Sequence, residues 1–132
     1  MTSQATVQPN ILRDIDPQTP FLQQLQEKNE SGPITLVNTF VVPEGEMLNA
    51  IELWRKEASI MKATPGFIST QLHRGTGSSN VLVNVAIWES AEALREGFEN
   101  QDFQAALLQY PPGTVAYPHV LQRVAVDNIC TA

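Results

Sequence analysis

Two stretches of the chain carry rows of apolar residues at alternate positions, which predicts β-strands. In 81–88 the odd positions are all β-branched, and the even positions are apolar except for Asn84. In 34–42 the same alternation places Asn38 alone in an apolar row. A strand that is apolar on both faces is covered on both sides, so each amide needs a partner inside the protein or in a ligand. Asn38 and Asn84 are therefore the first candidate functional residues.

Helical periodicity predicts two longer helices. From 46 to 63, apolar residues recur at spacings of three and four and form a core-facing stripe. The members of this stripe are Met47, Leu48, Ile51, Trp54, Ala58 and Met61. Ser90 is a good N-cap for a helix over 91–100, and a short helical segment is expected from Asp102 onward.

Further strands expected at 67–74 and 117–126 complete the order strand, helix, strand, strand, helix, strand. This order is typical of the ferredoxin-like split βαβ fold, an α+β class. It predicts an antiparallel sheet with the helices on one face, in which the first and third strands form a parallel central pair. Asn38 and Asn84 are then neighbours. The other sheet face is rich in valine and too apolar to stay wet, so we expect a homodimer through this face.

The length of 132 residues fits one domain. Residues 1–31 are polar and broken by prolines, which predicts an N-terminal tail with room for a short helix at 20–29. The domain itself is expected at 32–127, followed by a short tail at 128–132.

Charge and cysteine content exclude several classes of function. The net charge is −6 and the eight basic residues are scattered, so nucleic acid is not an expected partner. No stretch approaches the roughly 18–20 apolar residues of a membrane helix, so no membrane association is expected. Cys130 is the only cysteine, which excludes an internal disulfide and a cysteine-based metal site. We therefore expect a cytoplasmic protein without a bound metal.

With these residues in view, the chain resembles the antibiotic biosynthesis monooxygenase family of dimeric α/β barrels. The matching motifs are Leu36–Val37–Asn38–Thr39–Phe40, Pro65–Gly66–Phe67, Leu72–His73–Arg74 and Val83–Asn84–Val85–Ala86–Ile87–Trp88–Glu89–Ser90. The similarity covers residues 33–126. It implies oxidation of an electron-rich aromatic or quinol by O₂ without a cofactor, with Asn38, Asn84 and Trp88 as the catalytic residues.

Two other functions stay open at this point. Haem-degrading members of the superfamily carry a histidine on the second helical region, where this chain offers Leu107 and no histidine, so haem is disfavoured. The same fold also serves non-oxidative small-molecule binding proteins and isomerases.

Oxidation without flavin or metal requires a substrate that loses a proton and gives an electron to O₂ itself. The two amides can donate hydrogen bonds to the resulting oxyanion, and Trp88 can supply a flat wall. Four residues separate Asn84 from Trp88, roughly 13 Å along a strand, which argues for a large planar substrate. The alternative is that the amides bond each other or the backbone and fix strand register, while Trp88 packs on a helix.

Other residues are expected to contact the substrate from the surrounding elements. Phe40 shares a face with Asn38, Trp54 belongs to the helix that roofs the pocket, and Leu107 and Tyr110 precede a proline-rich loop that can act as a lid. His73 and His119 are candidate general bases because histidine titrates near neutrality. His73 lies on an expected edge strand, where exposure to solvent is the simpler interpretation.

Overall fold

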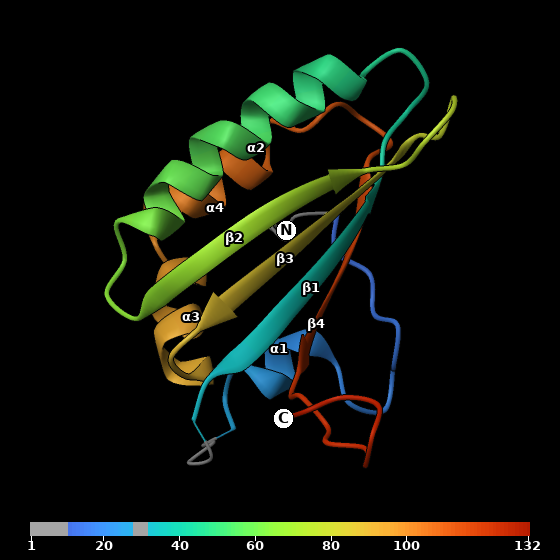
Figure 1. The fold of residues 1–132 in the computed structure, drawn as a ribbon. Coiled ribbons are helices and arrows are strands. Elements are labelled where there is room, and N and C mark those ends of the chain that lie inside the picture. The colour runs from blue at the N-terminus through green and yellow to red at the C-terminus, as the bar shows by residue number, and fades with distance from the viewer. Residues whose placement is uncertain (1–10, 28–31) are drawn as a thin grey trace.

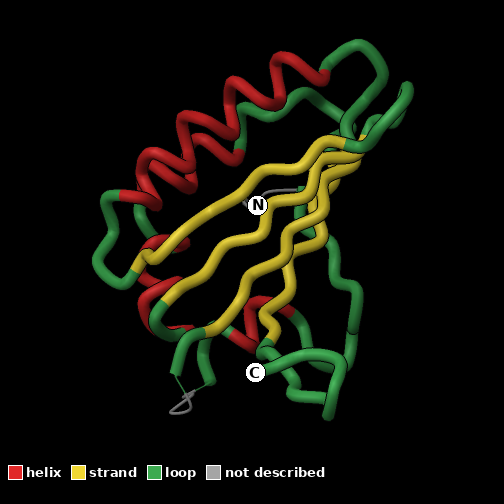
Figure 2. The backbone as a smooth tube through the Cα atoms, in the orientation of Figure 1, coloured by secondary structure: helices red, strands yellow, loops and turns green. Residues whose placement is uncertain are grey.

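A four-stranded sheet forms the centre of the computed structural model, which describes residues 11–27 and 32–132 (Figure 1). The strands are β1 (Ile34–Val41), β2 (Phe67–Arg74), β3 (Val81–Trp88) and β4 (Val115–Leu121), in the spatial order β2-β3-β1-β4. The helices are α1 (Phe21–Gln24), α2 (Met47–Lys62), α3 (Ala91–Phe98) and α4 (Gln101–Leu107). Figure 2 shows α2, α3 and α4 together on one face of the sheet. This is the ferredoxin-like α+β fold, as predicted.

All neighbouring strands run antiparallel, so the prediction of a parallel central pair is wrong. Each crossover does return a strand parallel to the one before it, but another strand lies between the two. β3 separates β1 from β2, and β1 separates β3 from β4. The predicted neighbourhood of the two amides is nevertheless confirmed, because the register places Asn38 directly opposite Asn84.

Helix α2 packs through a stripe that differs in part from the predicted one. Met47, Ala50 and Leu53 are buried, whereas Leu48 is 75% exposed. Leu48 follows Met47 by one residue, which turns it about 100° away around a helix of 3.6 residues per turn. Its assignment to the core stripe is therefore wrong.

Strand β4 ends five residues earlier than the predicted 117–126. Its pairing with β1 runs from Val115 to Leu121, where Leu121 lies opposite Thr35 near the start of β1. Beyond this point β1 offers almost no further backbone to pair with, so the ladder stops. Residues 122–132 are exposed.

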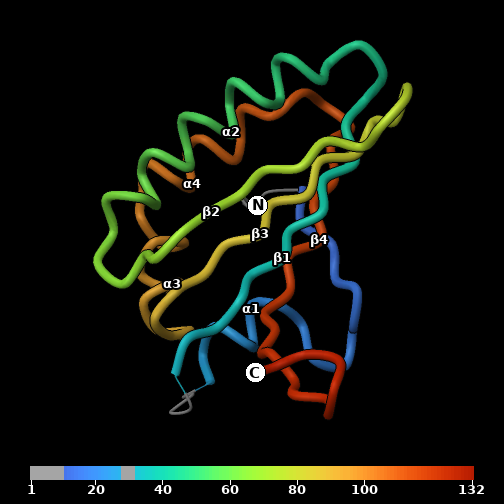
Figure 3. Tube along the Cα trace, in the orientation of Figure 1, coloured from blue at the N-terminus to red at the C-terminus, as the bar shows by residue number. Residues whose placement is uncertain are grey.

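Part of the expected N-terminal tail packs on the domain. Ile11, Phe21 and Leu25 are buried, and the backbone of Arg13 and Ile11 bonds that of Ala116 on β4. Figure 3 shows this segment running beside β4. The expected helix at 20–29 is a single turn, and residues 28 and 29 lie outside the described part of the chain.

The sheet face opposite the helices is rich in valine along β1 and β3. The pairs Val37–Val85, Thr39–Val83 and Val41–Val81 lie on it, because side chains alternate between the two faces. Within residues 11–27 and 32–132, no helix is long and apolar enough to cross a membrane.

Candidate functional site

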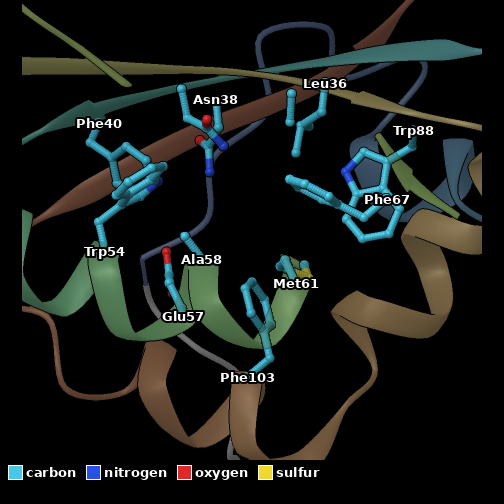
Figure 4. A pocket seen from close by; sticks show the side chains of 12 residues that line it. Leu36, Asn38, Phe40, Trp54, Glu57, Ala58, Met61, Phe67, Trp88 and Phe103 are labelled. Atoms are coloured by element: carbon cyan, nitrogen blue, oxygen red, sulfur yellow. The ribbon is translucent and has the colours of Figure 1, made fainter. Parts of the chain in front are cut away.

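A cavity of about 50 Å³ lies between the sheet and helix α2 (Figure 4). The strands supply its floor and the helix its roof. The floor residues are Leu36, Asn38, Phe40, Asn84, Ala86 and Trp88; the roof and sides come from Trp54, Glu57, Ala58, Met61, Phe67 and Phe103. Trp54, Ala58 and Met61 on α2 and Phe67 on β2 are half-buried, so the cavity opens between these two elements.

Aromatic side chains at both ends explain why a hollow exists here. Phe40 stacks on Tyr110 with ring centroids 5.4 Å apart, and Trp88 meets Phe67 edge to face at 5.4 Å. Phe40, Phe67 and Trp88 line the cavity, so one member or both of each pair bounds it. Between them the facing residues are short, notably Ala58 on α2 and Ala86 on β3. Helix and sheet therefore leave space unfilled near the two amides.

The amide of Asn84 is oriented by a neighbouring side chain. Thr70 on β2 donates its hydroxyl to Asn84 Oδ1. With that oxygen engaged, the Nδ2 group is the part of the amide left to donate. Asn38 lies beside it, and its Oδ1 is buried without a hydrogen-bond partner. On the floor, the Asn84 amide is thus oriented by a hydrogen bond, whereas the acceptor oxygen of Asn38 has no partner.

A buried carboxyl group faces these amides from the helix. Glu57 is only 4% exposed. Its Oε1 accepts a hydrogen bond of 2.6 Å from the Tyr110 hydroxyl, whereas its Oε2 has no hydrogen-bond partner. In Figure 4 the Glu57 side chain points from α2 toward Asn38.

Burial shifts the acidity of this carboxyl strongly. Loss of hydration raises the pKa of Glu57 to about 7, although the hydrogen bond from Tyr110 opposes the shift. Burial, together with the nearby Glu57 carboxyl, raises the pKa of Tyr110 well above its usual range, so the phenol stays protonated. The pocket therefore contains a carboxyl group that changes protonation state near neutral pH.

The structure brings five of the predicted site residues to one cavity: Asn38, Asn84, Trp88, Trp54 and Phe40. The other three lie outside its lining. Tyr110 is buried behind Glu57, and Leu107 is buried in the core formed with α2. His73 is exposed, and its pairing with Val83 places it on the opposite sheet face. His119 lies on that face too, because it pairs with Val37.

Sequence reasoning missed Glu57 and Thr70. The signal for Glu57 was its spacing, since it lies four residues after Leu53 and four before Met61, within the buried side of α2. A carboxyl at that position interrupts an apolar stripe as each Asn interrupts an apolar strand row. Thr70 carried no comparable signal, because a threonine on an edge strand is ordinary.

The separation of Asn84 and Trp88 predicted a large planar substrate. The cavity is too small to hold such a molecule. An engineered cavity on the order of 150 Å³ holds a benzene molecule, against about 50 Å³ here. A ring therefore enters only when half-buried side chains such as Met61 or Trp54 move outward.

Fold and site together define an α+β domain with a largely apolar cavity between sheet and helix that has polar groups on two sides. Residues 33–108 match the model of the family described as antibiotic biosynthesis monooxygenase. This chain belongs to that family.

Solved structures agree with this assignment. A provisionally assigned monooxygenase from Shewanella loihica PV-4 is 32% identical, with a TM-score of 0.61, over 74% of this chain and 100% of that one. SnoaB, a cofactor-independent oxygenase from Streptomyces nogalater, has the same fold with a TM-score of 0.64 and 22% identity, over 74% of this chain and 99% of its own. None of the curated proteins is similar enough to this chain to count as a match.

Proposed function

We propose that this chain is a cofactor-independent monooxygenase that oxidises an electron-rich aromatic or quinol with O₂. The observation that carries the proposal is the pair of amides, Asn38 and Asn84, on the floor of a largely apolar cavity between sheet and helix. Family membership supports it, because related structures include a cofactor-independent oxygenase.

In this reaction the substrate supplies all the electrons. It loses a proton to become an oxyanion and then transfers an electron to O₂. One oxygen atom enters the substrate and the other leaves as water. Asn84, with its carbonyl oxygen held by Thr70, donates an N–H to the oxyanion, and Asn38 contacts the same group. Trp88 forms the apolar end wall that keeps water away.

Oxygen uptake by the wild-type protein and Asn84→Ala tests this proposal. A panel of 1,4-hydroquinones and anthrones is offered, and the oxygen electrode records the rate above the uncatalysed reaction. We expect Asn84→Ala to lose roughly 100-fold or more in rate, as when an oxyanion donor is removed. Asn49→Ala is the matched control. Asn49 is exposed on α2, so this variant makes the same chemical change away from the pocket.

Two results contradict the proposal. One is a wild-type protein that accelerates oxygen uptake with no member of the panel. The other is an Asn84→Ala variant that is as fast as Asn49→Ala.

A non-oxidative isomerase is the second candidate, favoured by one observation. Glu57 has a pKa of about 7 and an unpartnered oxygen in the pocket, which suits proton transfer between two positions of a substrate. Conversion of a hydroxycarbonyl compound under argon, followed by NMR, distinguishes it from the oxygenase. Haem is disfavoured as a ligand because no histidine occurs among the described residues that line the cavity.

We also propose that two copies associate through the apolar sheet face that carries Val37, Val83 and Val85. Only one face of the sheet is covered by the helices, and a second copy offers a matching apolar surface. The cytoplasm is the compartment we propose, since Cys130 is a free, exposed thiol.

A further inference from the structure

The unpartnered oxygen of Glu57 is the least expected feature of the pocket. A buried polar atom without a hydrogen bond costs free energy, and an ionised carboxylate costs more. Glu57 is 4% exposed, yet only Oε1 is satisfied, by Tyr110 at 2.6 Å. Glu57 lines the cavity together with Asn38, whose Oδ1 is likewise unpartnered. Two buried oxygens without a hydrogen-bond partner therefore belong to residues that line the same cavity.

A purely structural role leaves this arrangement unexplained. Tyr110 is anchored independently by stacking on Phe40, and its bond to Glu57 uses one carboxyl oxygen only. A carboxyl needed only to satisfy Tyr110 could be a neutral amide. Free acceptors on both sides of a cavity instead indicate a ligand that brings hydrogen-bond donors, such as the hydroxyl groups of a phenol or hydroquinone.

We propose that Glu57 is the proton acceptor of this pocket and that Tyr110 positions it. This inference rests on the proposed site, and adds to it the group that activates the substrate and the class of molecule that binds. The hydroxyl proton of the ligand moves to Glu57 Oε2, and the O–H bonding pair stays on the ligand oxygen. The resulting aryloxide accepts the N–H donors of the floor amides, while Glu57 becomes a neutral carboxylic acid.

The small size of the cavity favours a ligand with one aromatic ring. The void of about 50 Å³ must grow to on the order of 150 Å³ to hold a benzene-sized molecule. Outward movement of the half-buried Met61 and Trp54 side chains supplies this space at the open side. A tricyclic molecule requires displacement of the buried Phe103 or Trp88 as well.

The ionisable groups around Glu57 are few. Its hydroxyl partner Tyr110 stays protonated, and the sheet presents only the amides of Asn38 and Asn84. From α4 the contact is the apolar Phe103. Glu57 is the one carboxyl or histidine among the described residues that line the cavity, so protonation coupled to binding can be assigned to it.

Anaerobic binding of 4-nitrophenol tests the proposal without any turnover. The dissociation constant is measured by absorbance at several pH values for wild type, Glu57→Gln and the matched control Glu52→Gln, an exposed residue of the same helix. Above neutral pH both the free Glu57 carboxyl and the free 4-nitrophenol are ionised. The wild-type complex must then take up one proton, which the carboxyl and the phenol share. We therefore expect its dissociation constant to rise about tenfold per pH unit.

Glu57→Gln should bind the phenolate without taking up a proton, so its dissociation constant should level off in the same range. Glu52→Gln should follow wild type. Tyr110→Phe should move the onset of the rise to higher pH, because loss of the hydroxyl donor raises the pKa of Glu57 further.

Two outcomes overturn the inference: a pH dependence in Glu57→Gln equal to that of wild type, or no binding of 4-nitrophenol by wild type. The oxygenase proposal fails separately. If no quinol accelerates oxygen uptake but binding still depends on Glu57 in this way, the oxidation is excluded and the proton acceptor stands. If Asn84→Ala abolishes oxygen uptake while Glu57→Gln changes neither the rate nor the binding profile, the oxygenase proposal stands and Glu57 is excluded as the proton acceptor.

Discussion

The buried carboxyl group of Glu57 links the stability of this protein to pH. Its pKa is raised to about 7 in the folded protein, against 4.5 as the ordinary value. The folded state therefore prefers the protonated form. Its contribution to the free energy of unfolding is fully present below about pH 4.5 and is lost as the pH rises toward 7.

We expect wild type to lose about 2–3 kcal/mol more stability than Glu57→Gln between about pH 5 and about pH 8. Glutamine keeps the shape and the acceptor for Tyr110 but does not ionise. Urea denaturation at both pH values, with Glu52→Gln as control, measures this difference. Parallel losses in wild type and Glu57→Gln would show that the carboxyl is not buried as described.

Residue-scale prediction from sequence worked where a polar residue broke an apolar alternation. Asn38 and Asn84 were found in this way, and their opposition across β1 and β3 followed from the fold. Glu57 was not predicted, because charged residues are frequent on helices. Whether such a residue is buried depends on how α2 is rotated against α4 and the sheet. Rotation of that kind is set by packing of the whole domain.

At the scale of elements, the N-terminal segment closes one edge of the sheet. Gln24 of α1 mimics a strand, since its side-chain oxygen accepts from Val120 N at 2.9 Å and its amide donates to Val120 O at 3.0 Å. Phe21 anchors this turn against Phe98, with ring centroids 5.5 Å apart. An open edge strand invites pairing with other chains, so this segment protects β4.

Phe21→Ala should therefore lower the free energy of unfolding by about 3–4 kcal/mol, as expected for an aromatic residue removed from a core. Leu22→Ala is the control, because Leu22 is 44% exposed, and we expect a change within about 0.5 kcal/mol. Chemical denaturation compares the two. Equal small effects would mean that α1 is not part of the folded domain.

The element order and most strand bounds could be predicted from periodicity and turn residues. The short helix near Phe21 and Leu25 could also be predicted, but whether it docks on the domain or on a partner could not, and the packing of Ile11 gave no periodic signal. The end of β4 was also beyond reach, since a strand continues only as far as its neighbour β1 does. Both depend on contacts between parts of the chain that are distant in sequence.

At the scale of the molecule, the valine-rich sheet face predicts a specific response to charge. Val85 lies at its centre, opposite Val37 on β1 and Gln71 on β2. We expect wild type to run at twice the chain mass of 14.6 kDa and Val85→Lys to run as a monomer, by light scattering after size exclusion. Burial of an unpaired lysine charge at an apolar interface is more unfavourable in free energy than the apolar contact is favourable.

Leu48→Lys serves as control for this experiment. Leu48 is 75% exposed on α2, on the helical side of the molecule, so the same added charge should leave the mass unchanged. A monomeric wild type, or a Val85→Lys variant that keeps the wild-type mass, would remove the sheet face as the site of association.

The floor of the cavity belongs to strands and its roof to a helix, and in that roof the residues that set the room above the amides are separate from Glu57. Substitutions at Ala58 or Met61 alter the room above the amides without altering the strand register that holds them. A lineage, or a protein engineer, can therefore exchange one accepted molecule for another by changing Ala58 and Met61 while Glu57 is kept. The chemistry would be inherited intact.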